Sequence, residues 1–234
     1  MVRGVIFDKD GTLFDFRATW GAWAGRAFME LAGGDPELAD RLATATGFDM
    51  TTRSFDPDSP IIAGTPDDIA QCLLPHLPAA DLSTLVARMN AVSAETPQVP
   101  ATDLNALFED LSKRDLRLGL ITNDAEAPAQ THLRDAGIVG HFHFIAGFDS
   151  GHGAKPSPEP LLAFAQGQGL PPDSVVMVGD SLHDLAAARA AGMRCVGVLT
   201  GLAGRAELES LADCVLPDIG HLPAWIDAQD GLPA

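Results

Sequence analysis

The feature that most constrains the fold is a short apolar run that ends in two carboxylates and a glycine. Residues 5–13 read Val-Ile-Phe-Asp-Lys-Asp-Gly-Thr-Leu. Asp8 closes the apolar run, Asp10 follows two residues later, and Gly11 lets the backbone turn with little steric penalty. A carboxylate that attacks phosphorus needs a cation to screen its charge, and the leaving alkoxide needs a proton. The spacing suits Asp8 as a nucleophile and Asp10 as its acid and base, with the Asp10 carbonyl near a shared metal.

Polar side chains also follow a second apolar run. Residues 117–121 predict a buried strand that ends at Thr122 and Asn123, whose hydroxyl and amide are suited to hydrogen-bond phosphate oxygens. Lys155, one of only three lysines in the chain, lies in the proline-rich loop 153–160. A lysine ammonium is a compact point charge, so a role in neutralising phosphate fits its position.

A third apolar run, residues 175–178, leads into two further carboxylates. Asp180 follows the predicted strand, and Asp184 comes four residues later, about one turn into the next predicted helix. Both carboxylates can therefore face one cavity together with Asp8.

Strands and helices alternate along most of the chain, which predicts an α/β fold. Continuously apolar strands separated by helices are typical of a parallel sheet covered on both faces, and such sheets bind ligands at the carboxyl ends of their strands. Besides the N-terminal strand, the patterns predict strands at 117–121, 142–146, 175–178, 195–199 and 213–216, and helices at 103–114, 126–136, 158–168 and 182–191.

The four polar segments, in this order, resemble the four motifs of the haloacid dehalogenase-like superfamily, and the resemblance covers essentially the whole chain. It implies a three-layer, Rossmann-like parallel sheet. It also implies that Asp8 becomes an aspartyl-phosphate and that Asp10 acts first as general acid and then as base. Thr122 and Asn123 match the phosphate-binding pair, and Lys155 matches the basic residue.

The same resemblance implies a magnesium ion, which prefers hard oxygen ligands. Asp8, Asp10 and Asp180 match its ligands in the family, and Asp184 matches either a ligand or a partner of one.

Residues 15–96 interrupt the alternation with helical periodicity and no convincing strand, and Pro97 and Pro100 mark a return linker. This insertion resembles the helical cap of the phosphoglycolate phosphatase-like and β-phosphoglucomutase-like branch. We therefore expect a core domain of residues 1–14 and 97–234 and a cap domain of residues 15–96. Caps of this type exclude water and select the substrate.

Within the cap, Trp20 and Trp23 are assigned to its hydrophobic core. Arg53, in a loop-like stretch, is the preferred cap residue for contacting substrate, with Arg17 second.

The residues also discriminate among reactions. Relatives that cleave carbon–halogen bonds lack the second carboxylate and the metal site, and phosphonate-cleaving relatives need a cap lysine, which is absent between Lys9 and Lys113. The sequence favours a phosphatase for a small phosphate monoester, with phosphoglycolate as the leading candidate. A sugar-phosphate mutase and a non-catalytic binding or regulatory protein remain as alternatives.

Composition restricts the partners. The formal net charge of −17 argues against nucleic acid or an anionic membrane as a partner. The three cysteines have no paired spacing, the N-terminus leads almost directly into the first strand, and no apolar run approaches a membrane span. We expect a cytoplasmic enzyme that binds a small phosphate ester; its oligomeric state is not indicated.

Overall fold

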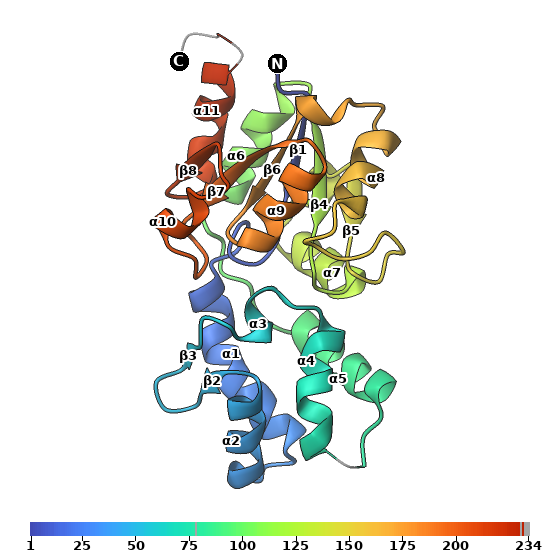
Figure 1. Ribbon diagram of the computed structural model, residues 1–234, viewed down its shortest axis with the longest axis vertical. Coiled ribbons are helices and arrows are strands. Elements are labelled where there is room, and N and C mark those ends of the chain that lie inside the picture. Colours follow the sequence, from blue (N-terminus) through green and yellow to red (C-terminus); the bar gives the residue numbers. More distant parts are fainter. Residues whose placement is uncertain (78, 230, 232–234) are drawn as a thin grey trace.

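A six-stranded parallel sheet and the helices that cover it form the larger part of the computed structural model, which describes residues 1–77, 79–229 and 231 (Figure 1). Its strand order is β5-β4-β1-β6-β7-β8, so that β1 lies between β4 and β6. The α/β fold predicted from the sequence, with its Rossmann-like sheet, is confirmed. The strands are β1 (Gly4–Phe7), β4 (Arg117–Ile121), β5 (Phe144–Ala146), β6 (Val175–Gly179), β7 (Arg194–Val198) and β8 (Cys214–Leu216).

Helices cover both faces of this sheet. Successive side chains of a strand point to opposite sides, and the strands are apolar on both sides, so each face packs against helices. Val5 and Phe7 pack in one core cluster with residues of α6, α7 and α11. Ile6 packs in the other cluster, with residues of α8, α9 and α10. These helices are α6 (Leu104–Ser112), α7 (Glu126–Asp135), α8 (Glu159–Gly167), α9 (Leu182–Ala190), α10 (Arg205–Leu208) and α11 (Leu222–Gln229), and short 3-10 turns span Leu74–His76, Val139–His141, Pro172–Ser174 and Ile219–His221.

Helices α10 and α11 were not predicted. In α11 the buried residues are Leu222 and Ile226, which pack in the same cluster as α6. Leu222, Trp225 and Ile226 have helical spacing, but eight residues are too few for this pattern to identify a helix, and the packing against the sheet is not visible in the sequence.

Residues 16–94 form a helical group at one end of the molecule, opposite the two termini (Figure 1). Their buried residues make a separate hydrophobic cluster that includes Ala24, Leu42, Leu73 and Leu85. The helices are α1 (Phe16–Leu31), α2 (Pro36–Ala45), α3 (Pro60–Ala63), α4 (Pro66–Leu73) and α5 (Leu82–Ala94).

Each of these helices begins at a residue whose side chain accepts a hydrogen bond from a main-chain N–H of the first turn, the usual way to satisfy those donors. The capping residues are Asp15, Asp35, Ser59, Thr65 and Asp81.

The group also contains an antiparallel hairpin, β2 (Phe48–Asp49) with β3 (Ser54–Phe55), where we expected no strand. Asp49 accepts hydrogen bonds from the N–H groups of Thr51 and Thr52, and Arg53 has a positive φ of 55°. Two-residue strands are too short to show an alternating pattern, which explains why the sequence does not reveal them.

The two chain segments that join the helical group to the sheet lie side by side. The N–H of Asp15 donates to the carbonyl of Val99 at 2.8 Å, and the N–H of Ala101 donates to the carbonyl of Leu13 at 2.9 Å. Because the first of these segments leads from the carboxyl end of β1 into α1, the helical group faces the carboxyl ends of the strands.

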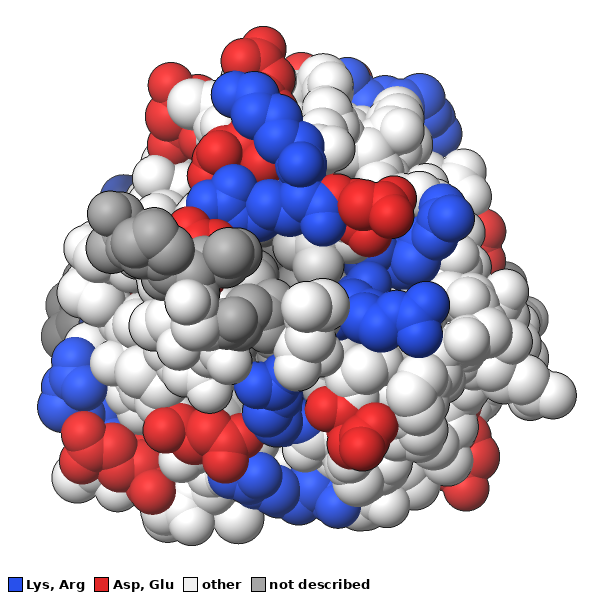
Figure 2. Space-filling model, turned by 90° about the horizontal axis from the view of Figure 1, so that it is seen from above, with Lys and Arg blue, Asp and Glu red and all other residues white. Residues whose placement is uncertain are grey.

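The molecular surface carries both signs of charge. Figure 2, which views the end away from the helical group, shows basic and acidic side chains interspersed, so the negative net charge does not form a continuous acidic surface on this face. None of the helices described is long and apolar enough to cross a membrane.

Candidate active site

The polar residues that follow three neighbouring strands meet at one edge of the sheet. Asp8 follows β1, Thr122 follows β4 and Asp180 follows β6. Phe7 pairs with Leu120 of β4 and with Val178 of β6, so the next residues along the three strands come close together. All three polar side chains are at least nine-tenths buried and line one cavity.

Lys155 joins the first and fourth motifs. Its Nζ atom lies 2.6 Å from Asp8 Oδ1 and 2.6 Å from Asp184 Oδ1, and its side chain is buried. Burial alone would lower the pKa of Lys155, but the carboxylates of Asp184 and Asp8 together raise it above its ordinary value. The lysine is therefore a permanent positive charge beside Asp8.

Asp184 is held in place from both sides. Its Oδ2 accepts hydrogen bonds from the N–H and the hydroxyl of Ser181, which makes a capping box at the start of α9, and its Oδ1 accepts from Lys155. Asp184 thus orients Lys155 toward Asp8.

Asn123 has a different environment from the one expected for a phosphate ligand. Its Oδ1 accepts from the N–H of Lys155 at 2.9 Å, and its Nδ2 donates to the carbonyls of Lys155 and Ala63, both at 2.8 Å. The side-chain amide is therefore occupied in positioning the lysine loop and contacting α3. Thr122, which lines the cavity, keeps its hydroxyl proton available, because its Oγ1 only accepts, from the N–H of Asp124.

Three buried carboxylates form a set that suits a metal ion. One oxygen from each of Asp8, Asp180 and Asp184 lies within 4.8 Å of the others. Burial is the largest cause that raises the pKa of Asp8 to about 7, with Asp184 and Asp10 adding to it and Lys155 opposing it. Burial and the charges of Asp184 and Asp8 likewise raise the pKa of Asp180 well above its usual range. The single charge of Lys155 does not balance three ionised carboxylates, and hard oxygen donors in this number fit Mg²⁺.

Two glycines make room for the Asp180 carboxylate. Gly11 has a φ of 77°, and a Cβ atom built on it would overlap the Asp180 side chain; a Cβ on Gly201 would do the same. The glycine after Asp10 therefore has two uses, the turn itself and the close approach of Asp180.

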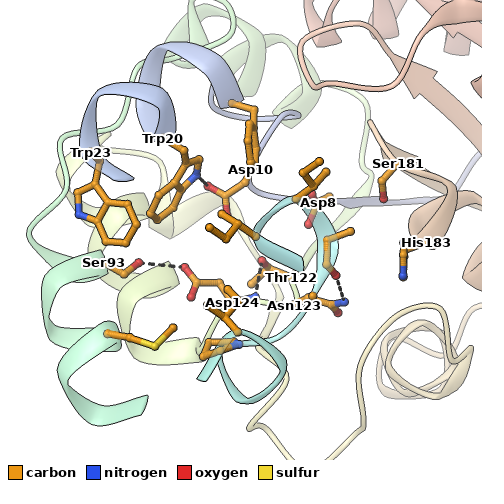
Figure 3. A pocket seen from close by; sticks show the side chains of 18 of the residues that line it. Asp8, Asp10, Trp20, Trp23, Ser93, Thr122, Asn123, Asp124, Ser181 and His183 are labelled. Atoms are coloured by element: carbon orange, nitrogen blue, oxygen red, sulfur yellow. Dashed lines mark hydrogen bonds between the residues drawn. The ribbon is translucent and has the colours of Figure 1, made fainter. Parts of the chain in front are cut away.

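Asp10 lies at the boundary between the sheet and the helical group. Its Oδ1 accepts a hydrogen bond of 2.8 Å from the indole Nε1 of Trp20 in α1 (Figure 3). Its Oδ2 lies 2.7 Å from Lys9 Nζ. Trp20 is buried and Trp23 packs against the hydrophobic cluster of the helical group, as assigned from the sequence. Their rings also stand edge to face, with centroids 4.7 Å apart, and line the cavity.

Lys9 is a buried lysine that the sequence reading did not single out. Its side chain is fully buried; besides Asp10 it contacts Asp124 at 3.3 Å and His132 Nδ1 at 3.3 Å. Burial, followed by the charge of Lys9, lowers the pKa of His132, so its neutral ring accepts from Lys9 and donates through Nε2 to the carbonyl of Ser93. The signal was present in the sequence, since a lysine stands between two carboxylates directly after a strand.

The cavity extends from these charged groups into the helical group. It has a volume of about 110 Å³ and is lined by residues of α1, α3, α4 and α5 as well as by the strand ends. Arg53, the preferred cap contact, does not line it: Arg53 is exposed on the loop between β2 and β3. Arg17 is exposed on α1 and does not line it either. His183 is exposed and lies at the edge of the cavity.

Comparisons with known proteins agree with this arrangement. Residues 2–192 match the family model for haloacid dehalogenase-like hydrolases. A phosphoglycolate phosphatase of Yersinia pseudotuberculosis is 37% identical over 100% of this chain and 95% of its own length, and one of Neisseria meningitidis is 33% identical over 95% and 91%.

The fold is similar to that of solved relatives. The crystal structure of a predicted phosphoglycolate phosphatase from Haemophilus somnus superimposes with a TM-score of 0.73 at 19% identity, covering 96% of this chain and 98% of that one. With the family model matching most of the chain, and relatives above 30% identity over nearly its full length, the chain belongs to the haloacid dehalogenase-like hydrolases.

Proposed function

We propose that the protein is a magnesium-dependent phosphatase that hydrolyses a small phosphate monoester through an aspartyl-phosphate on Asp8. The observation that carries this proposal is the position of the Asp8 carboxylate, buried at the end of β1, 2.6 Å from Lys155 and two residues before Asp10. A nucleophile, a fixed cation and a proton donor thus line one cavity.

In the first half of the reaction, a carboxylate oxygen of Asp8 attacks phosphorus and forms an acyl-phosphate bond. The bond between phosphorus and the ester oxygen breaks, and the leaving oxygen takes a proton from the Asp10 carboxylic acid. Lys155 and the Thr122 hydroxyl are placed to stabilise the phosphoryl oxygens.

In the second half, the Asp10 carboxylate takes a proton from a water molecule whose oxygen attacks phosphorus. The bond from phosphorus to Asp8 breaks, which releases inorganic phosphate and restores both side chains. Trp20 directs Asp10 through its indole N–H and contributes to the wall that separates this step from bulk solvent.

Asp8, the main-chain carbonyl of Asp10, and Asp180 would hold the magnesium ion, and Asp184 would orient Lys155 beside it. When bound, the ion supplies the positive charge that lets an anionic nucleophile approach an anionic phosphate.

We further propose that residues 15–96 act as a cap domain on the core of residues 1–14 and 97–234. Three contacts between the two parts support this division: Trp20 to Asp10, Ser93 to Asp124 at 3.3 Å (Figure 3), and Asn123 to the Ala63 carbonyl. Together they close the cavity over the nucleophile, which excludes competing water.

Phosphoglycolate is the first ester to assay, because the similar proteins of Yersinia and Neisseria carry that name. A sugar-phosphate mutase is less well supported: it must bind a second phosphate, and the helical group places no lysine or arginine among the described residues that line the cavity.

Turnover of p-nitrophenyl phosphate tests the proposal. We expect phosphate release with Mg²⁺, its loss with a chelator, and its recovery when Mg²⁺ is restored in excess. Activity that is insensitive to chelation would contradict the metal assignment, and absence of turnover under all conditions would favour the non-catalytic alternative.

A further inference from the structure

The part of the cavity farthest from the carboxylates is apolar. Its wall includes Trp23 and Phe28 of α1, Ile62 of α3, Ile69 of α4 and Met89 of α5. The nucleophile and Lys155 form the opposite end. A substrate with its phosphate at Asp8 therefore directs the rest of the molecule toward hydrocarbon and aromatic side chains.

The charges along this path are unfavourable for a second anion. Among the described residues that line the cavity, Lys155 is the only lysine or arginine, and it is paired with Asp8 and Asp184. In Figure 3 the carboxylates of Asp10 and Asp124 lie between Asp8 and Trp23, and they accept hydrogen bonds from Trp20 and Ser93 of the helical group. A carboxylate on the leaving group would approach those two carboxylates and find no cation beyond them.

Lys9 does not change this conclusion. It is fully buried behind Asp10 and Asp124, with its ammonium engaged by both carboxylates and by His132, and it is not part of the cavity wall. The arginines of the helical group are all exposed and none of them lines the cavity: Arg17, Arg26, Arg41, Arg53 and Arg88. An anion buried without a partner is strongly disfavoured, whereas an apolar group gains free energy by leaving water.

We infer that the physiological leaving group is uncharged and largely apolar, rather than a carboxylate-bearing group such as glycolate. This inference rests on the proposed phosphatase function and specifies its substrate class. The aromatic side chains Trp20, Trp23 and Phe28 offer ring faces and edges for such a group.

Three matched esters test the inference in the unmodified enzyme with Mg²⁺: benzyl phosphate, para-carbamoylbenzyl phosphate and para-carboxybenzyl phosphate. All leave as benzylic alkoxides, and the last two have nearly the same size but differ in charge. We expect kcat/KM for the carboxy ester to be at least about tenfold below that for the carbamoyl ester, because its charge is left unpaired. We also expect benzyl phosphate to exceed phosphoglycolate by at least about tenfold.

A cation introduced into the wall should weaken the discrimination against the charged ester. Ile62 lines the cavity, is only half-buried and lies outside the cluster that forms the core of the helical group. Ile62→Lys should raise the ratio of carboxy to carbamoyl turnover several-fold. Ala91→Lys adds the same charge at an exposed position of α5 that does not line the cavity, so it should leave the ratio unchanged.

The outcomes separate the inference from the proposed function. Equal or better turnover of the carboxy ester, or a clear preference for phosphoglycolate over benzyl phosphate, would overturn the inference while leaving the phosphatase intact. Failure of all four esters and of p-nitrophenyl phosphate would overturn the phosphatase assignment and the inference with it. The comparison of esters in the unmodified enzyme decides the matter even where Ile62→Lys does not fold.

Discussion

At the scale of single residues, the site is organised by two buried lysines with separate duties. Lys155 lies between Asp8, the proposed nucleophile, and Asp184. Lys9 lies between Asp10 and Asp124, and its ammonium also contacts His132. Each lysine offsets the repulsion between two nearby carboxylates. Asp8 and Asp10 lie in one turn, and each is held in position by a different lysine.

The proposed role of Asp10 as proton donor predicts that the loss of rate in Asp10→Asn depends on the leaving group of the ester. Asp10→Asn should slow benzyl phosphate far more than p-nitrophenyl phosphate, because nitrophenolate leaves with little acid assistance and a benzylic alkoxide does not. Steady-state kcat/KM on both esters measures the difference.

Asp124→Asn is the matched control, since Asp124 also pairs with Lys9 and lines the cavity. It removes the same charge without removing the proton donor, so we expect it to affect both esters alike. Equal losses on both esters in Asp10→Asn would assign Asp10 to positioning alone.

At the scale of secondary-structure elements, the cavity depends on short helices whose ends are fixed by capping. Helix α4 supplies Ile69 and Leu73 to the cavity wall and begins at Thr65, which forms a capping box with Asp68. The Thr65 hydroxyl accepts from the N–H of Asp68 at 3.2 Å, while Asp68 Oδ2 accepts from the N–H of Thr65 at 2.9 Å.

Loss of this cap should be visible in stability. Thr65→Ala should lower the free energy of unfolding by about 1 kcal/mol, because it leaves a main-chain donor of the first turn without its acceptor. Thr65→Ser keeps the hydroxyl and should stay close to the unmodified protein. Denaturant titration measures both variants; an alanine variant as stable as the serine variant would contradict a contribution from this cap.

At the scale of the whole molecule, stability and metal binding are linked through the buried carboxylates. The pKa of Asp8 is raised from 3.8 to about 7, and that of Asp180 is raised in the same direction. A carboxyl whose pKa is higher in the folded than in the unfolded state holds its proton more tightly when folded. Its stabilising contribution is present below about pH 4 and is lost as the pH rises through about 7.

We therefore expect the metal-free protein to lose thermal stability between about pH 4 and pH 7, and Mg²⁺ to restore it at the upper end, where the carboxylates are ionised. Melting temperatures with chelator and with Mg²⁺ across this range test the expectation. Asp8→Asn serves as the control and should show a shallower loss in chelator. A metal-free stability that rises steadily over the same range would contradict the assignment.

The sheet and the strand-end residues were predictable because both depend on local pattern. The apolar runs that end at Asp8, Thr122 and Asp180 lie side by side once the strands are parallel, and β1 pairs with both β4 and β6 as this requires. The sequence alone therefore predicted that Asp8, Thr122 and Asp180 lie close together, as they do in the structure.

The contacts of the helical group were not predictable, because they join residues distant in sequence. No local pattern pairs the Trp20 indole with Asp10, or the Asn123 amide with Ala63. Arg53 was selected for its charge, but it lies in the loop between the two short strands of the β2–β3 hairpin, where its side chain is exposed. Residue type indicated what chemistry was available, and only packing determined which side chains face the cavity.

The most direct test of the account is to trap the covalent intermediate. Mixing the Asp10→Asn variant with Mg²⁺ and p-nitrophenyl phosphate, quenching in acid and measuring the mass of the protein and of its peptides should reveal one added phosphoryl group on Asp8. The same treatment of Asp8→Asn should give no adduct, and its turnover should fall at least ~10³-fold with the fold retained. A phosphoryl group on another residue, or near-normal turnover by Asp8→Asn, would contradict the account.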